Sequence, residues 1–313
     1  MLVPEQISNA KIIFSPLNWG MGHVSRSIPI LQQLLQQNNS IIVFCSAEQE
    51  RIYTQYFNEL HYERHEPYDF SFQADGFKLL GFMARLPKLI QQHTKEKQRV
   101  KTYLQSNPTD YIISDQRFGF RNKSVFSIFI THQCVLPIPW YFGIGQLLNR
   151  YLIGRFDQTW IVDDVHKRFA GNLSRRLHTN HAYLGLKSRF PVATPSGLDE
   201  KHLQILIFNG PREFHPLLIE AFHQDLEQID VIIGERHKGF EGKRHISSWK
   251  EADEVLRKAS VIYSFSGYST LMDVVQLGCA WKCIPTPGQK EQEYIYKKTL
   301  AKGLGFYNEI NSD

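Results

Sequence analysis

Short apolar runs alternate with helical stretches along almost the whole chain, and this alternation constrains the fold more than any other feature. The runs typical of strands lie at 11–17, 40–47, 110–115, 125–131, 159–164, 203–210, 229–235, 260–265 and 280–285. Near-continuous apolar strands separated by helices are typical of parallel sheets with helices on both faces. We therefore predict an α/β fold built from doubly wound parallel sheets.

The alternation is interrupted once, over residues 187–202. This segment contains two prolines, one glycine and no apolar periodicity, which is the composition of a linker. A chain of 313 residues has room for two domains. We predict Rossmann-like domains over 1–186 and 203–313 that face a central cleft, because ligands of such sheets bind at the carboxyl ends of the strands.

Composition and charge exclude several classes of protein. The chain is 42% hydrophobic and 21% charged, which argues against a disordered or collagen-like chain. Its apolar runs are shorter than the ~20 residues that a membrane span needs. A net charge of +5 is too small to indicate nucleic-acid binding by itself. The first residues do not resemble a signal peptide, and the four cysteines suit buried thiols in a reducing cytoplasm, where we expect the protein.

A glycine-rich turn over 18–23 follows the first strand and begins the first helix. Gly20 and Gly22 allow a tight turn and a close approach to a ligand, and the helix N-terminus favours negative charge. The turn is not a dinucleotide fingerprint, because Ser25 stands at the third glycine position. His23 can take up a proton near neutral pH and is a candidate base. A histidine that only binds a neighbouring carbonyl is the alternative.

Polar residues also gather after the strands at 260–265 and 280–285. Residues 266–270 offer backbone N–H groups and hydroxyls at a helix start, which suits a diphosphate. Asp273 lies one helical turn further on, where it could accept hydrogen bonds from ribose hydroxyls. The run 289–293 begins the next helix and could contact the hydroxyls of a sugar. Two ordinary loops would leave this clustering of polar residues unexplained.

Six sequence blocks, in the same order, resemble GT-B glycosyltransferases. The blocks are PLNWGMGHVSRSIPI, ISDQRFGF, IFITHQ, GRFDQTWIVDD, FNGPRE and SGYSTLMDVVQLG followed by IPTPGQKEQEY. They are similar to the family 28-like inverting enzymes related to the one that adds N-acetylglucosamine to the lipid-linked peptidoglycan precursor, and closer still to a group of bacterial glycosyltransferase-like proteins. The resemblance implies two facing Rossmann-like domains and transfer of a sugar, with inversion, from a UDP-sugar.

The resemblance also implies which residues bind the donor. By position they are Gly210, Arg212, Ser266, Gly267, Ser269, Thr270, Asp273, Gln289, Gln292 and Glu293. Asp273 stands where relatives place a ribose-binding acid, usually Glu. Glu293 stands where the peptidoglycan enzyme has Gln, which leaves the identity of the sugar open. Pro211 and Arg212 replace small residues of the first glycine loop, which indicates a reshaped site.

On the acceptor side, the resemblance implies roles for Gly20, Gly22, His132 and Gln133, and it identifies His23 with the histidine of the family's glycine loop. Asp115 ends a predicted strand, and a His23–Asp115 pair would fix the imidazole tautomer and raise its basicity. A pair between Asp115 and Arg117 is the alternative. The implied mechanism is one displacement at the anomeric carbon, in which His23 takes the acceptor proton.

Neither a metal nor a cofactor is expected, because no Asp-x-Asp motif lies near the nucleotide loops. Cations in the 234–245 loop could balance the diphosphate instead: Arg236, Lys238, Lys243 and Arg244. The apolar and aromatic segment 136–156, with the basic segment 85–101, suggests contact with an anionic leaflet and a lipid-linked or cell-envelope acceptor. Burial of this segment in the core is the alternative.

Two other functions stay open. The sequence ends soon after GFYNEI, whereas GT-B enzymes usually finish with a helix that crosses back to the first domain, so either this protein lacks that helix or the sequence is truncated. Its absence, with the altered glycine loop, would suit a non-catalytic nucleotide-sugar-binding subunit. A GT-B sugar-nucleotide 2-epimerase is the second alternative, and it would need further carboxylates in the cleft.

Overall fold

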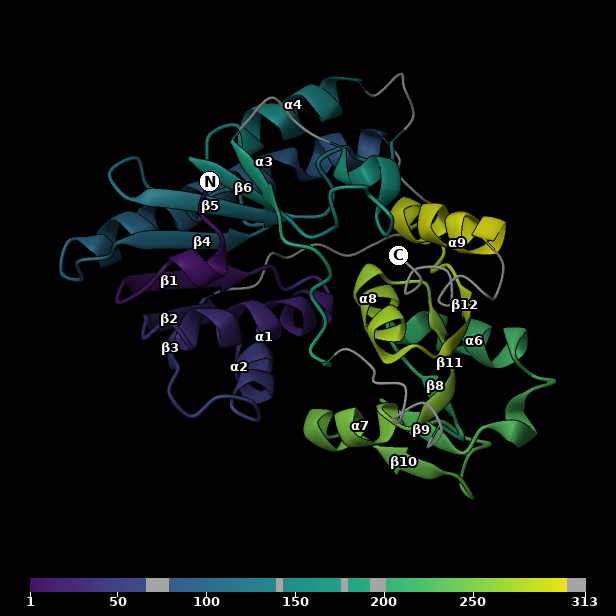
Figure 1. Cartoon of the computed structure of the whole chain (residues 1–313). Helices are drawn as coiled ribbons and strands as arrows, with labels where there is room; N and C mark the ends of the chain where they lie inside the picture. The colour runs from purple at the N-terminus through teal and green to yellow at the C-terminus, as the bar shows by residue number, and fades with distance from the viewer. Residues whose placement is uncertain (66–78, 139–142, 176–179, 192–200, 303–313) are drawn as a thin grey trace. The chain divides into compact units, whose positions relative to one another are not determined.

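The computed structural model describes the chain except for residues 66–78, 139–142, 176–179, 192–200 and 303–313. The chain forms two compact units, Met1–Lys187 and Ser188–Asp313. Each unit is built on a parallel sheet with helices (Figure 1), so the prediction of an α/β fold with doubly wound parallel sheets is confirmed. Most of the predicted linker, and the end of the chain where a crossing helix would begin, lie outside the described residues.

The first unit contains a seven-stranded sheet in the order β3-β2-β1-β4-β5-β6-β7. Its strands are β1 (Lys11–Pro16), β2 (Ser40–Cys45), β3 (His61–Arg64), β4 (Tyr111–Asp115), β5 (Phe126–Thr131), β6 (Gln158–Ile161) and β7 (His181–Tyr183). Its helices are α1 (Gly22–Leu35), α2 (Ala47–Tyr53), α3 (Leu79–Leu104) and α4 (Gly143–Ile153), with short 3-10 turns η1 (Pro4–Gln6) and η3 (Gly171–Ser174). All five strands predicted for this half are present, and β3 and β7 are additional.

The chain order places a topological switch between β1 and β4. The chain runs outward from β1 through β2 to β3, returns to β4 and then runs the other way. Because such crossovers are right-handed, α1 and α2 cover one face of the sheet and α3 and α4 the other (Figure 1). Ligands of open parallel sheets bind at the carboxyl ends of the strands beside such a switch.

The second unit contains a five-stranded sheet in the order β10-β9-β8-β11-β12. Its strands are β8 (Leu203–Ile207), β9 (Val231–Ile233), β10 (Arg244–Ile246), β11 (Ala259–Phe265) and β12 (Ala280–Ile284). Its helices are α6 (His215–Ala221), α7 (Trp249–Leu256), α8 (Tyr268–Leu277) and α9 (Lys290–Lys302), with 3-10 turns η4 (Arg212–Phe214) and η5 (Leu226–Gln228). All four predicted strands are present, β10 is additional, and the switch lies between β8 and β11.

Apolar side chains fix both sheets between their helices. In the first unit, Ile13, Phe44 and Ile112 of the sheet pack with Val100 of α3. In the second unit, a larger cluster joins β8, β9 and β11 to α6: Leu206, Phe208, Phe214, Leu218, Phe222, Ile229, Ile232, Phe240, Tyr263 and Phe265. Burial on this scale holds the strand ends, and therefore the loops that follow them, in fixed positions. Among the described residues, no helix is long and apolar enough to cross a bilayer.

Candidate functional site

Four buried polar side chains meet at the carboxyl ends of three neighbouring strands in the first unit. His23 and Arg26 come from the first turns of α1, which follows β1, whereas Asp115 ends β4 and His132 follows β5. Their exposed fractions are 9%, 2%, 0% and 4%, in that order. Buried charged groups are rare unless they are paired and hydrogen-bonded, so this cluster is the strongest site candidate in the unit.

The Arg26 guanidinium holds the other three side chains together. Its Nε donates to Asp115 Oδ2 at 3.0 Å, and its Nη2 pairs with Oδ1 of the same carboxylate. Its Nη1 lies 2.7 Å from Nδ1 of His132. Because a guanidinium has donors only, Nδ1 of His132 accepts this hydrogen bond and the proton of the neutral ring resides on Nε2. His132 therefore presents an N–H donor on its other side.

His23 has two possible partners for one nitrogen atom. Its Nδ1 lies 3.1 Å from Asp115 Oδ2 and 2.8 Å from Arg26 Nη2. If Nδ1 carries the proton, it donates to Asp115 and Nε2 keeps a lone pair that can accept a proton from a substrate. If Nδ1 accepts from Arg26, the proton of the neutral ring lies on Nε2 and the ring cannot act as a base there.

Burial and charge set the protonation of this cluster. Burial lowers the pKa of His23, and Arg26 lowers it further against the opposing effect of Asp115. The imidazole is therefore neutral at pH 7. Burial disfavours ionisation of Asp115, but Arg26 and His23 outweigh it and bring its pKa to about 2. The cluster thus combines an ionised carboxylate, a fixed cation and a neutral imidazole, which suits general base chemistry.

Two partners were predicted for the Asp115 carboxylate, His23 and Arg117, and in the structure it contacts His23. Arg117 faces another buried group, with its Nε 2.5 Å from Oε1 of Glu96 and its Nη2 3.1 Å from Nε2 of His65. Burial, with Arg117 and Arg99, lowers the pKa of His65 to about 2. This second network stabilises the loop after β4 and is separate from the contacts of Asp115 with His23 and Arg26.

The predicted glycine turn and the His/Gln block lie beside this cluster. Gly20 has φ +66°, a conformation that glycine adopts without strain, and Gly22 is the first residue of α1. Next to His132, the Gln133 backbone N–H donates to Oγ1 of Thr131 at 2.9 Å. Gln133 Nε2 lies 3.4 Å from Nε2 of His132. The structure therefore brings the residues predicted for the acceptor side together with the candidate base.

In the second unit, the loop after β8 is joined to the loop after β11. Asn209 Oδ1 accepts from the Phe265 backbone N–H at 2.9 Å, and its Nδ2 lies 3.3 Å from Thr270 Oγ1. Gly210 has φ +75°, and a Cβ there would lie 3.2 Å from the Phe265 ring. The positive φ therefore favours glycine at this position, and a Cβ there would have to displace the Phe265 ring by a few tenths of an ångström.

The predicted phosphate loop forms the start of α8. Gly267 is the N-cap, and Ser269 and Thr270 are half-buried in the first turn, whose N–H groups have no acceptor within the helix. Ser266 is fully buried, and its hydroxyl donates to the Gln292 carbonyl at 2.9 Å. Ser266 therefore supports the loop, whereas Ser269 and Thr270 are better placed to meet a ligand.

Residues 289–293, which were predicted to contact a sugar, make hydrogen bonds and an ion pair that stabilise the loop in which they lie. Gln292 Oε1 accepts from the Thr286 backbone N–H at 2.9 Å, and Gln292 Nε2 donates to Oε1 of Gln289 at 2.6 Å. Glu293 forms an ion pair with Lys290 at 2.9 Å. Of these residues, Gln289 and Glu293 are half-buried and Gln292 is buried. Contact of these side chains with a sugar stays a prediction.

In the structure, Asp273 binds Ser188 and Arg189. Its Oδ1 accepts from the Ser188 hydroxyl at 2.6 Å, and its Oδ2 pairs with Arg189, which also pairs with Asp253 at 2.6 Å. Asp273 is 8% exposed. It therefore attaches the segment that begins the second unit to α8, and binding of ribose by this carboxylate stays a prediction.

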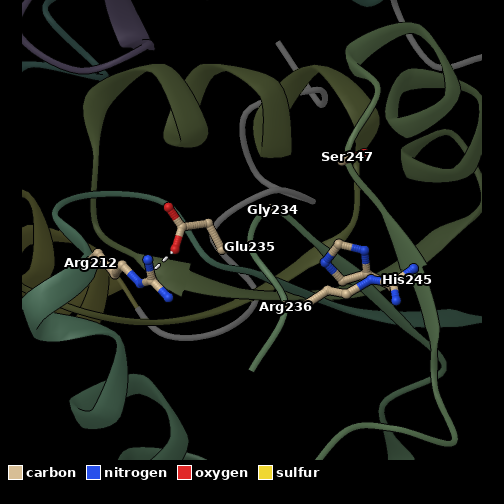
Figure 2. A pocket seen from close by; sticks show the side chains of 6 residues that line it. All are labelled: Arg212, Gly234, Glu235, Arg236, His245 and Ser247. Atoms are coloured by element: carbon tan, nitrogen blue, oxygen red, sulfur yellow. Dashed lines mark ion pairs between the residues drawn. The ribbon is translucent and has the colours of Figure 1, made fainter. Parts of the chain in front are cut away.

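A pocket of about 550 Å³ lies at the carboxyl ends of β8, β9 and β10 (Figure 2). It is lined by Arg212, Gly234, Glu235, Arg236, His245 and Ser247. Arg212 Nε contacts Oε2 of Glu235 at 2.9 Å. Arg212 and Arg236 were predicted from the sequence, whereas the pocket residues of the short strand β10 and its loop, His245 and Ser247, were not. The other proposed cations lie elsewhere: Lys243 binds the Glu227 carbonyl, Arg244 pairs with Glu251, and Lys238 is exposed.

This chain is similar to known proteins in its three-dimensional structure. No protein-family model matches the sequence, and no curated protein matches it significantly. The solved glycotransferase of kitacinnamycin is similar, with a TM-score of 0.62 at 12% identity over 94% of this chain and 85% of that one. The Arabidopsis thaliana protein UGT89C1 has a TM-score of 0.60 at 14% identity over 94% and 83%.

The match with the spinosyn rhamnosyltransferase SpnG, solved with thymidine diphosphate, covers most of both chains. Its TM-score is 0.60 at 11% identity, over 97% of this chain and 96% of that one. At such identities the likeness establishes architecture rather than chemistry. With its two parallel sheets, this chain has the GT-B fold of two Rossmann-like units.

Proposed function

We propose that this chain is an inverting glycosyltransferase that moves a sugar from a UDP-linked donor to an acceptor hydroxyl. The observation that carries the proposal is the buried cluster of His23, Arg26, Asp115 and His132 at the switch point of the first unit. Solved proteins with the same fold include transferases in complex with UDP and with thymidine diphosphate. A neutral imidazole beside an ionised carboxylate is what removal of a proton from a hydroxyl requires.

In the proposed reaction, the acceptor hydroxyl loses its proton to Nε2 of His23. The acceptor oxygen forms a bond to the anomeric carbon from the face opposite the diphosphate, and the bond between that carbon and the diphosphate oxygen breaks. The nucleoside diphosphate leaves with the electron pair. Asp115 stabilises the imidazolium that forms, and Arg26 keeps Asp115 ionised.

We assign donor binding to the second unit. The first turn of α8, with Ser269 and Thr270, offers a helix N-terminus to the diphosphate. Arg212 and Arg236 add positive charge in the neighbouring pocket (Figure 2). These groups would stabilise the charge that develops on the leaving diphosphate. We expect no metal ion in this step.

The acceptor is proposed to be lipid-linked, of the cell-envelope type, and reached from the cytoplasmic face of the membrane. Helix α4 exposes 82% of Ile144, 65% of Leu147 and 61% of Tyr151. Arg150 lies in the last turn of this helix, and Arg155 lies two residues beyond its end. An apolar helix face with basic neighbours can rest on an anionic leaflet.

Vesicle binding tests this part of the proposal. Leu147→Ser should weaken sedimentation with vesicles that contain anionic lipid, because it removes an exposed apolar side chain. Leu217→Ser is the control, since Leu217 is also exposed but lies on the second unit. Equal sedimentation of the wild type and Leu147→Ser would remove α4 from the proposal.

One observation favours a second candidate, a non-catalytic nucleotide-sugar-binding subunit. Arg26 Nη2 lies closer to His23 Nδ1 than Asp115 Oδ2 does. If Arg26 fixes the tautomer with the proton on Nε2, the chain binds a donor without turning it over.

Calorimetric titration with UDP, GDP, dTDP and several UDP-sugars, followed by assays for UDP release, separates the two candidates. Selective UDP binding with release of UDP from one UDP-sugar supports the transferase. Binding without release supports the subunit. Absence of binding by every nucleotide would contradict both.

A further inference from the structure

The loops after β8 and β9 bring together two histidines and a glutamate that the proposed reaction does not use. One ligand atom from each of His215, Glu235 and His237 lies within 4.8 Å of the other two. His215 is the first residue of α6, and the other two follow β9. The two imidazoles face each other directly, with His215 Nδ1 2.9 Å from His237 Nε2.

Packing holds both rings in place. The Phe208 ring lies 5.1 Å from the His215 ring and 4.1 Å from the His237 ring, measured between centroids. His215 is only 2% exposed, and within the described residues its Nε2 makes no hydrogen bond. Nε2 is the ring nitrogen that does not face His237, so Nδ1 is the His215 atom available to a metal in this group.

Each imidazole turns one nitrogen toward the other ring, and such a nitrogen carries, in the neutral ring, the lone pair that a metal requires. The carbonyls of Gly210 and Asn209 lie near His215 and could accept the N–H of a metal-bound ring, the usual outer contact of such a ligand.

We propose that His215, His237 and Glu235 form a binding site for a divalent transition metal of the Zn²⁺ type. Two imidazoles and one carboxylate are a ligand set that suits Zn²⁺, with a fourth position left for water or an anionic oxygen. Tetrahedral Zn²⁺ would separate the two ring nitrogens by about 3.3 Å. The observed 2.9 Å therefore has to open by only a few tenths of an ångström.

Glu235 is the most adaptable of the three ligands. It is exposed, and its present partner is Arg212, through Oε2 at 2.9 Å. A carboxylate has two oxygens, so it can serve Arg212 and a metal together or exchange one for the other. Bound metal would therefore fix the loop after β9 against the start of α6, beside the pocket of Figure 2. This inference does not depend on the proposed transferase activity.

Metal titration of the EDTA-treated protein tests the site. Zn²⁺ should bind with a stoichiometry of one in calorimetry and raise the unfolding midpoint by several degrees, whereas Mg²⁺, which prefers oxygen ligands, should not. Co²⁺ should give the intense visible absorption of a four-coordinate site.

Variants distinguish this site from chance binding by surface histidines. His237→Ala should weaken Zn²⁺ binding at least a hundredfold and abolish the Co²⁺ spectrum, and Glu235→Gln should weaken binding less. His223→Ala is the control, since His223 is exposed and lies outside the group. His237 is preferred to the buried His215, whose replacement could unfold the unit. Equal binding by the wild type and His237→Ala, or no binding of Zn²⁺ and Co²⁺, would overturn the proposal.

Discussion

The two units use the same topology in different ways. Each has a parallel sheet with a switch point, and in each the polar residues of interest follow the carboxyl ends of the strands. In the first unit they are buried charged side chains that bind one another. In the second they are the start of a helix, a glycine loop and cations open to solvent. This contrast supports the proposal that the first unit carries out proton transfer and that the second binds a charged ligand.

The energetic consequence is clearest for the arginines of the two units. Arg26 is buried against Asp115, whereas Arg212 and Arg244 pair with glutamates at the surface, where their side chains are 74% and 58% exposed. Desolvation makes a broken buried pair costly, while water and salt screen an exposed pair.

The largest effect on stability is expected from Arg26→Met. The change leaves the ionised Asp115 buried without its partner, and we expect a loss of about 3–5 kcal/mol in the free energy of unfolding. Arg244→Met, its surface counterpart in the second unit, should cost about 0–1 kcal/mol. Urea unfolding monitored by circular dichroism measures both. Similar losses for the two variants would mean that burial does not distinguish the units in this way.

Acid should destabilise the first unit through His65. Its pKa is 6.5 in the unfolded chain and about 2 in the folded one, so between these values the unfolded chain binds the extra proton. Stability is therefore full above pH 6.5 and falls as the pH decreases, by about 1.4 kcal/mol per pH unit. His65→Gln, which does not titrate, should reduce this slope by that amount between pH 6 and 5. An unchanged slope would show that His65 is protonated in the folded protein.

Gly210→Ala should have a moderate effect on the second unit. A side chain at φ +75° costs about 1–2 kcal/mol, and its Cβ would press on the Phe265 ring at 3.2 Å. Gly239→Ala is the matched control, because Gly239 also has positive φ but has nothing within 4 Å. Both variants should lose stability, but only Gly210→Ala should also weaken UDP binding in calorimetry. Equal UDP affinities would place the donor away from this loop.

The smallest effect is expected from Arg212→Gln. Because this side chain is exposed, its loss should leave the unfolding midpoint unchanged and weaken UDP binding by about two- to fivefold. Arg244→Gln should change neither quantity. An affinity unchanged by both substitutions would remove Arg212 from the donor site, while a large loss of stability would show that the ion pair with Glu235 has a structural role.

The strands missed from the sequence share one property. β3, β7 and β10 are all edge strands of their sheets. They are only three or four residues long and contain His61, Arg64, His181 and Arg244. Edge strands are often short and polar, so the apolar runs that identify central strands do not occur in them. The pocket residues after β10 were missed for the same reason.

The candidate site could be predicted in part because its residues lie in loops at strand ends. The resemblance to inverting transferases suggested the pairing of His23 with Asp115, and the structure has their contact. Arg26 was not anticipated, although it lies one helical turn after His23 and so shares its face. Charged residues on a helix are usually solvated, and only the fold shows that this one faces Asp115. The partners of Asp273, which lie 84 and 85 residues away, are likewise a product of tertiary structure.

The most direct test of the account is UDP release from UDP-sugars by the wild type and by His23→Ala, with UDP affinity measured on the same samples. If His23 is the base, the variant should bind UDP as the wild type does and release it about 10²–10⁴ times more slowly. The wild type should also show an acid limb in its rate profile below the ordinary range of a histidine pKa, because burial lowers the pKa of His23. Equal rates of release in the two proteins would contradict the assignment of His23, and with it the proposed role of the first unit.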